Sequence, residues 1–218
     1  MSEITICYGM TETAPVSAQS STSDSVEQRV GTVGRVHPHL EIKIVDEQGK
    51  VVPRGQLGEL CVRGYSVMLG YWEDHEKSQE VIDSARWMHT GDIAEMDEAG
   101  FVKIKGRIKD VVIRGGENLF PKEIEDFLYT HPDVSDVQVI GLPDARYGEE
   151  LCACIILHEH HEITEESIRQ YCAEHISHNK VPRYVRFFNE FPMTASGKAQ
   201  KFKLQEFMRN ELDLKEIA

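Results

Sequence analysis

The feature that most constrains the fold of this 218-residue chain is a change in its apolar pattern at Gly106 and Arg107. Between Gly31 and this point, short alternating apolar segments are separated by glycine-bearing turns, which is typical of antiparallel strands. Beyond it, strand-like segments alternate with segments of helical spacing. The sequence therefore predicts two parts, residues 1–108 and 109–218, the first a small barrel or curled sheet that is β-rich from about residue 31.

Each part has its own expected elements. Residues 17–28 are rich in serine and are expected to form a polar surface loop. In the first part, strands are expected at residues 40–45, 51–52, 58–64, 92–96 and 101–105. In the second part, strands are expected at residues 111–113, 137–140, 152–157 and 184–188. Helices should begin at Pro121 and after Thr164, and a last helix should be lined by Leu204, Phe207, Met208 and Leu212.

The composition narrows the class of protein. An apolar fraction of 40% and a charged fraction of 28% are ordinary for a globular protein with a sizeable core. The net charge of −13 argues against a nucleic-acid-binding surface, whereas an ATP site needs only a few local cations. No apolar run has the length of a transmembrane segment, so we expect a soluble intracellular protein. Cys152 and Cys154 alternate along a predicted strand and are expected to be core thiols on one face.

The segment Tyr8-Gly-Met-Thr-Glu12 follows an apolar run at residues 4–7. A strand that ends in such a segment can offer a ring face to a base, hydroxyls to phosphate oxygens and a carboxylate to Mg²⁺. A strand end with a polar turn is the structural alternative. Taken alone, the segment leaves both interpretations open, with Tyr8, Thr11 and Glu12 as the residues that could contact a nucleotide.

Several other polar residues can carry chemistry. Lys198 ends the small polar loop 192–198, and a lysine on a mobile loop can meet an oxyanion or a phosphate or can simply be a solvated loop residue. Asp92, in Thr-Gly-Asp, can bind ribose hydroxyls or serve only as a turn residue. Gly115 and Gly116 can admit a thin ligand close to the backbone or only supply positive φ. The histidines of segment 158–161 lack the spacing of a zinc site and indicate an exposed turn.

The joint order of seven short motifs carries more information than any one of them. Together these motifs resemble the adenylate-forming, AMP-binding superfamily, most closely the acyl-CoA synthetases of the medium-chain fatty-acid type. Segments 64–72 and 176–178 contribute to the narrower assignment. The motifs are YGMTE (8–12), GELCVRG (58–64), GYW (70–72), TGD (90–92), GRIKD (106–110), GGENLFPKEIE (115–125) and SGK (196–198).

The resemblance implies an α+β fold and a ligase activity. Residues 1–108 would be the C-terminal remnant of the large AMP-binding domain, and residues 109–218 the complete small C-terminal lid domain. Enzymes of this family use ATP and Mg²⁺ to convert a carboxylic acid into an acyl-adenylate, with release of pyrophosphate. Coenzyme A then attacks the adenylate to give a thioester. The implied substrates are a fatty acid, ATP and coenzyme A.

The resemblance also assigns roles within the first part. Tyr8 would stack on adenine, and Thr11 would bond the α-phosphate. Glu12 would hold Mg²⁺. Asp92 would bind the ribose hydroxyls, and Arg107 would reach the ribose or the phosphate.

In the second part, Lys198 matches the catalytic lysine of the family. It would bridge carboxylate and phosphate oxygens, where a fixed cation lowers the repulsion between two anionic groups. Lys109 occupies the position of the family's hinge. Gly115 and Gly116 would face the pantetheine arm of coenzyme A.

One departure from the family is large, because nothing in the chain matches its phosphate loop or most of its acyl pocket. We therefore expect a C-terminal fragment of an acyl-CoA synthetase with little or no activity alone. The subfamily is typically mitochondrial, which favours the mitochondrial matrix. Association with a full-length synthetase is a further expectation. Two alternatives stay open: a luciferase-like or aryl-acid ligase, and a non-catalytic truncated interaction module.

Overall fold

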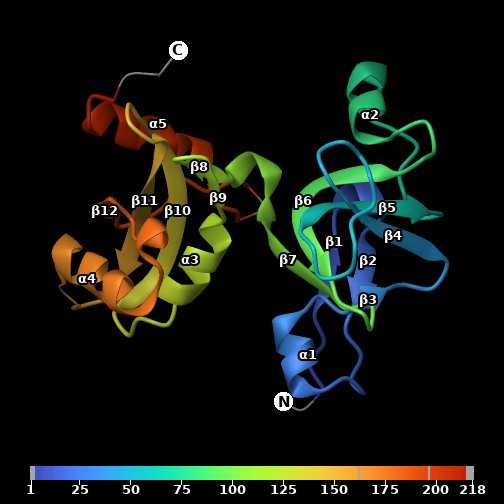
Figure 1. Cartoon of the computed structure of the whole chain (residues 1–218), viewed down its shortest axis with the longest axis horizontal. Coiled ribbons are helices and arrows are strands. Elements are labelled where there is room, and N and C mark those ends of the chain that lie inside the picture. Colours follow the sequence, from blue (N-terminus) through green and yellow to red (C-terminus); the bar gives the residue numbers. More distant parts are fainter. Residues whose placement is uncertain (1–2, 162, 196, 215–218) are drawn as a thin grey trace. The chain divides into compact units, whose positions relative to one another are not determined.

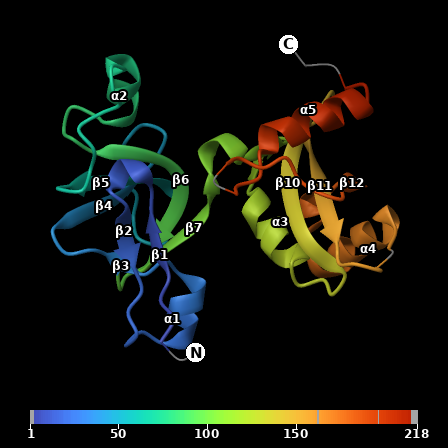
Figure 2. The ribbon, with the colours of Figure 1, turned by 180° about the vertical axis from the view of Figure 1, so that it is seen from behind.

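The computed structural model describes residues 3–161, 163–195 and 197–214. Its internal contacts divide the chain into two compact units, Met1–Lys109 and Asp110–Ala218. The first unit holds two sheets and the second unit one, and each unit has its own buried core. Figure 1 shows the ribbon of both units with their elements labelled, and Figure 2 shows the same ribbon from behind.

The first unit begins with a small antiparallel sheet. Its elements are β1 (Cys7–Gly9), the 3-10 turn η1 (Thr11–Thr13), β2 (Val16–Gln19), α1 (Val26–Gly31) and β3 (Arg35–Val36). The strands lie in the order β1-β2-β3, and Tyr8 is paired with Ala18. The expected strand over the preceding apolar run is thus shifted, so that Tyr8 lies within β1, whereas Thr11 and Glu12 lie in the turn η1.

The expectation of a polar surface loop over residues 17–28 is confirmed for residues 21–25 and wrong at both ends, where residues 17–19 lie in β2 and residues 26–28 in α1. Ser17 and Ala18 lie in the middle strand β2 and are buried, at 0% and 1% exposure. Strand β2 pairs with a strand on each side, and its two buried residues have small side chains, so no alternating apolar pattern marks it. Helix α1 begins after Ser25, whose hydroxyl accepts the Gln28 N–H in a capping box.

A second antiparallel sheet forms the larger part of the first unit. It comprises β4 (Leu40–Val45), β5 (Gly58–Gly64), β6 (Met88–Met96) and β7 (Val102–Arg107), in the order β4-β5-β6-β7. This linear order corresponds to the curled sheet rather than to a closed barrel, and the bent strands are visible in Figure 1. Along the chain, helix α2 (His75–Val81) follows β5 and precedes β6, and its N-terminus is capped by the Asp74 side chain. One core cluster of this unit is formed by Ile44, Leu60, Ala94, Met96 and Val102.

The second unit is built on a five-stranded mixed sheet. Its strands are β8 (Val112–Arg114), β9 (Glu117–Leu119), β10 (Val134–Asp144), β11 (Gly148–Leu157) and β12 (Tyr184–Phe187). The long hairpin β10–β11 is antiparallel, whereas β12 runs parallel to β11. Strands β8 and β9 continue the sheet beyond β11.

Three helices cover the two faces of this sheet: α3 (Pro121–Leu128), α4 (Glu165–His175) and α5 (Lys201–Glu211). Leu151, Ala153 and Ile155 on β11 share a core with α3 and α4, while Cys152 and Cys154 on the opposite face share a second core with α5. The prediction that both thiols face one side is therefore confirmed.

The helix starts agree with the sequence in detail. Pro121 is the first residue of α3, and the Thr164 hydroxyl caps α4 by accepting the Ser167 N–H. On α5, Leu204 and Met208 are buried as expected, but Phe207 is half-exposed. Among the described helices, none combines the length and the apolar character needed to cross a bilayer.

Candidate nucleotide-binding site

Three of the predicted site residues meet on the first unit. The Tyr8 hydroxyl on β1 donates a hydrogen bond of 2.5 Å to Asp92 Oδ2 on β6. Arg107, at the end of β7, places its Nε 3.4 Å from Asp92 Oδ1. Asp92 and Arg107 are direct cross-strand partners, so the sheet register itself brings the cation to the carboxylate.

The two residues of β6 before Asp92 hold its backbone in place. The Asp92 N–H donates to Thr90 Oγ1 at 3.1 Å, and the Thr90 hydroxyl donates to the Leu60 carbonyl at 2.7 Å. Gly91 adopts a φ of +71°, which favours glycine, and donates its N–H to Glu59 Oε1 at 3.0 Å. Asp92 is therefore a buried acceptor whose backbone is anchored through Thr90 and Gly91 to the neighbouring strand β5.

The environment of Tyr8 keeps its phenol protonated. Burial raises the pKa of Tyr8 well above its usual value, and the hydrogen bond to Asp92 raises it further. The ring packs against the core cluster of the β4–β7 sheet. Tyr8 thus offers a neutral aromatic ring and a hydrogen-bond donor that is engaged with Asp92.

Turn η1 presents Glu12 with one carboxylate oxygen engaged. Glu12 Oε1 accepts a hydrogen bond of 2.9 Å from the Tyr71 hydroxyl, and the Glu12 carbonyl accepts the Met68 N–H at 2.8 Å. Within the described residues, Glu12 Oε2 has no hydrogen-bond or ion-pair partner. Mg²⁺ binds one or two carboxylates together with phosphate oxygens and water, so this second oxygen fits the ion.

Thr11 and Thr13 play different parts in the same turn. Thr13 is fully buried, and its hydroxyl donates to the Met10 carbonyl at 3.1 Å and accepts the Met10 N–H at 3.2 Å. Thr11 is exposed, and its hydroxyl has no protein partner among the described residues. Thr13 therefore fixes the turn, and Thr11 keeps a hydroxyl available for a ligand.

The second unit carries Lys198 on an exposed loop. The Lys198 N–H donates to Thr194 Oγ1 at 3.0 Å, and the Lys198 carbonyl accepts the Thr194 N–H at 2.8 Å. Gly197 has a φ of +77°. In the part of the chain that the structure describes, the Lys198 ammonium has no ion-pair partner. The neighbouring Ser196 of the predicted motif lies outside the described residues.

Of the remaining predicted residues, Gly115 and Gly116 form a turn, and Lys109 lies at the boundary between the two units. Gly115 and Gly116 join β8 to β9 with φ values of +60° and +85°. A Cβ at Gly116 would meet no other atom within 4 Å. Lys109 lies in the 3-10 turn Ile108–Asp110 and is the last residue of the first unit.

The structure adds residues that the sequence analysis did not assign. Tyr71 was part of a family motif, but its hydrogen bond to Glu12 joins residues 59 positions apart, so no local sequence pattern predicts it.

The histidine segment 158–161 forms a turn, as expected: the His161 N–H donates to the His158 carbonyl, and His161 Nδ1 lies 2.5 Å from Asp133 Oδ1.

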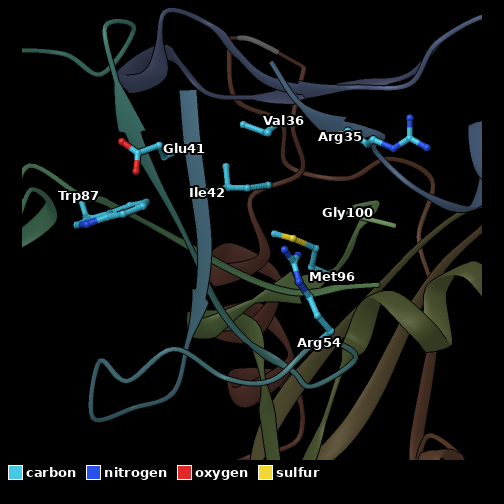
Figure 3. A pocket seen from close by; sticks show the side chains of 8 residues that line it. All are labelled: Arg35, Val36, Glu41, Ile42, Arg54, Trp87, Met96 and Gly100. Carbon is cyan, nitrogen blue, oxygen red and sulfur yellow. The ribbon is translucent and has the colours of Figure 1, made fainter. Parts of the chain in front are cut away.

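A separate pocket of about 350 Å³ opens on the first unit and is shown in Figure 3. Arg35, Glu41, Arg54 and Trp87 are among its lining residues. Arg35 also stacks over the ring of Phe101, with its guanidinium carbon 4.0 Å from the ring centre. The lining contains none of the site residues predicted from the sequence, so the pocket lies apart from the Tyr8–Asp92–Arg107 cluster.

The comparison with known families and proteins gives consistent matches. The profile of the AMP-binding enzyme family matches residues 1–72, and that of the AMP-binding enzyme C-terminal domain matches residues 123–198. The medium-chain acyl-CoA ligase ACSF2, mitochondrial, of Bos taurus is 53% identical over 215 residues, which is 98% of this chain and 35% of that protein. The putative acyl-CoA synthetase YngI of Bacillus subtilis is 51% identical over 207 residues, 94% of this chain and 38% of that protein.

A solved structure shows the same fold. The ATP-bound MatB from Rhodopseudomonas palustris superimposes with a TM-score of 0.88 at 34% identity, and the match covers 95% of this chain and 41% of that one. The chain thus spans little more than a third of the length of the curated relatives above. The α+β fold predicted from the sequence is confirmed.

Proposed function

This chain belongs to the AMP-binding enzyme family, and on that premise we propose that it serves in the ATP-dependent ligation of a carboxylic acid to coenzyme A. The reaction has two steps, formation of an acyl-adenylate with release of pyrophosphate and transfer of the acyl group to the thiol of coenzyme A. The observation that carries the proposal is the buried Asp92 carboxylate, which Tyr8 and Arg107 both contact.

The nucleotide would be held by the first unit. Asp92 accepts hydrogen bonds from the ribose hydroxyls, because its carboxylate is a buried acceptor oriented by Tyr8 and Arg107. The neutral ring of Tyr8 provides a stacking surface for adenine. Arg107 is half-exposed and can turn its guanidinium to the ribose or the phosphate, and Thr11 keeps a hydroxyl for the α-phosphate.

Glu12 is the residue that would hold Mg²⁺. Its Oε2 is available, and the Tyr71 hydroxyl orients the carboxylate through Oε1. The ion neutralises phosphate charge when it is bound.

In the second unit, Lys198 is proposed as the catalytic cation. Attacking carboxylate and α-phosphate are both anionic, so a lysine ammonium between them stabilises the transition state more than the ground state. Loss of one such contact costs about 3–4 kcal/mol of barrier. The side chain is exposed and has no ion-pair partner among the residues that the structure describes, which supports this role. Lys109 is proposed as the hinge, and Gly115 and Gly116 as the contact for the pantetheine arm.

The acid is proposed to be a medium-chain fatty acid, because the 53% identical relative is a medium-chain acyl-CoA ligase. That relative is also named as mitochondrial, which supports a mitochondrial location for this chain. Within its 218 residues the chain has no counterpart of the family's phosphate loop, so we expect little activity from it alone. Association with a full-length synthetase remains part of the proposal.

The central test is nucleotide binding to the 218-residue chain, measured by calorimetry with Mg·ATP. Asp92→Asn keeps the shape of the side chain but removes its charge, and we expect at least about a tenfold loss of affinity, because hydrogen bonds to a charged group contribute about 1.5–3 kcal/mol. Glu98→Gln is the matched control, since Glu98 is an exposed turn carboxylate. Equal affinities for Asp92→Asn and the unsubstituted chain would refute the assignment of Asp92.

The acid and the activity need a second assay. Acid-dependent ATP–pyrophosphate exchange is measured with medium-chain fatty acids and with aromatic acids. Exchange as fast as that of a full-length relative would contradict the expected low activity. Exchange with aromatic acids alone would favour an aryl-acid ligase over the fatty-acid ligase.

A further inference from the structure

Three potential metal ligands of different chemistry converge on one face of the β4–β7 sheet. Glu59 and Cys61 lie two residues apart on β5 and therefore share a face, and Cys61 is the direct cross-strand partner of His89 on β6. One ligand atom from each of the three lies within 4.8 Å of the others. Within the described residues, this is the one group of three or more such side chains that converges in this way.

The distances compare well with those of a tetrahedral site. Cys61 Sγ lies 3.6 Å from His89 Nδ1. Zinc bonds of about 2.3 Å to sulfur and about 2.05 Å to nitrogen place the two atoms about 3.6 Å apart at the tetrahedral angle. His89 Nδ1 lies 2.7 Å from Glu59 Oε2. This hydrogen-bonded pair would have to open to about 3.4 Å to admit the ion.

The surroundings of the histidine also fit a metal site. His89 Nε2, the nitrogen on the far side of the ring, lies 3.9 Å from Asp83 Oδ2. A carboxylate behind the second ring nitrogen is the usual partner of a metal-binding histidine. Glu59 uses its other oxygen, Oε1, to accept the Gly91 N–H, which fixes the direction of Oε2.

Burial leaves one approach to the group. Cys61 is fully buried, whereas the side chains of His89 and Glu59 are 31% and 19% exposed. An ion would enter from the side of His89 and Glu59, and water would complete its coordination. The charged side chains that face the Cys61 thiol are the cation Lys43, which is its cross-strand partner on β4, and the carboxylates of Glu59 and Asp83.

We propose that Cys61 Sγ, His89 Nδ1 and Glu59 Oε2 bind a thiophilic divalent cation of the zinc class, with water as the fourth ligand. Binding would form the metal–sulfur bond and release the thiol proton to solvent. In the free protein the thiol stays protonated, because burial raises the pKa of Cys61 to about 12. Thiolate and imidazole disfavour Mg²⁺, so this site is chemically distinct from Glu12.

The site does not depend on the proposed ligase activity. Its three ligands make no hydrogen bond or ion pair with Tyr8, Asp92 or Arg107 among the interactions of the described residues. Its test therefore uses metal binding as the readout rather than turnover.

The experiment titrates the chelator-treated 218-residue chain with Co²⁺ and follows the thiolate-to-cobalt absorption band. We expect one equivalent of Co²⁺ bound with this band and displaced by Zn²⁺. Cys7→Ser is the matched control, because Cys7 is an exposed thiol, and it should keep the band. Cys61→Ser should abolish the band, and His89→Gln should weaken Co²⁺ binding by at least about tenfold.

Two results would overturn the proposal. One is the absence of a thiolate band in the folded, unsubstituted chain. The other is binding of Co²⁺ to Cys61→Ser or to His89→Gln with the affinity and the band of the unsubstituted chain, which would identify an adventitious ion only. Circular dichroism of each metal-free variant checks folding. His89→Gln, with a partly exposed side chain, keeps the test decisive if Cys61→Ser does not fold.

Discussion

At the scale of single residues, the candidate site depends on phenol–carboxylate hydrogen bonds. Tyr8 donates to Asp92, and Tyr71 donates to Glu12. In each pair the phenol supplies a neutral donor, so the carboxylate keeps its charge while its direction is fixed. The two carboxylates are the groups proposed to bind ribose and Mg²⁺. Changing either supporting tyrosine is therefore a test of the site, as changing the carboxylate is.

The first prediction concerns Tyr71. Tyr71→Phe removes the donor to Glu12 Oε1 and leaves the ring in place. We expect the Mg²⁺ concentration that half-saturates ATP binding to rise about fivefold, because one hydrogen bond contributes about 1 kcal/mol to the orientation of the carboxylate. Tyr65→Phe is the control, since Tyr65 is 76% exposed. An unchanged Mg²⁺ requirement in Tyr71→Phe would show that Glu12 does not need this support.

The second prediction concerns pH and Tyr8. Burial and Asp92 raise the Tyr8 pKa above its usual value of 10.0. A phenol with a raised pKa stabilises the fold below its unfolded-state pKa, and this contribution is lost as pH rises through the folded-state value. The free energy of unfolding should therefore fall less steeply above about pH 10 in Tyr8→Phe than in the unsubstituted chain. Urea denaturation at a series of alkaline pH values measures both slopes, and parallel slopes would contradict the prediction.

At this scale the sequence identified the chemical groups but not all of their partners. Asp92 and Arg107 were assigned through the resemblance, and their cross-strand pairing brings them together. Tyr71 and Thr13 were missed, because a hydrogen bond across 59 positions and a buried turn hydroxyl leave no periodic pattern. Glu59 and Cys61 alternate on β5, but His89 joins them only through the register of β6.

At the scale of elements, helix caps and apolar periodicity predicted most helices and strands of the second unit. Short elements with few apolar residues were not predicted from the sequence. Helix α2 has seven residues, none of them buried, so no apolar stripe marks it. Strand β9 has three residues, and β2 owes its burial to small side chains. The hairpin β10–β11 is longer than expected, because Glu149 and Glu150 interrupt the apolar pattern although ladder pairing continues to Gly148.

The third prediction concerns the turn between β8 and β9. Gly116 has a φ of +85° and open space at its Cβ position, so Gly116→Ala adds no clash but forces a left-handed conformation. We expect a loss of about 1–2 kcal/mol in the free energy of unfolding. Gly31→Ala is the control, because Gly31 ends α1 without a positive φ and has the same open space. Urea denaturation of both variants tests the difference, and equal stabilities would contradict it.

At the scale of the whole molecule, the chain consists of two compact units with separate cores. The sheet of the second unit has both faces covered by its own helices α3, α4 and α5. Its burial therefore does not rely on residues of the first unit.

The fourth prediction follows from this independence. Residues 110–218, expressed alone, should show the far-UV circular dichroism of a mixed α/β fold and a single cooperative unfolding transition. Differential scanning calorimetry of this segment and of the whole chain measures the transitions. A broad, non-cooperative transition in residues 110–218 would show that its core needs the first unit.

The hydrogen bond between Tyr8 and Asp92 also has a consequence for synthesis on the ribosome. The two residues are 84 positions apart, so translation at about 5–20 residues per second adds Asp92 about 4–17 s after Tyr8. During this interval the nascent chain contains β1 but neither the acceptor for its phenol nor strands β6 and β7. The nucleotide site can therefore assemble only when synthesis of the first unit is nearly complete.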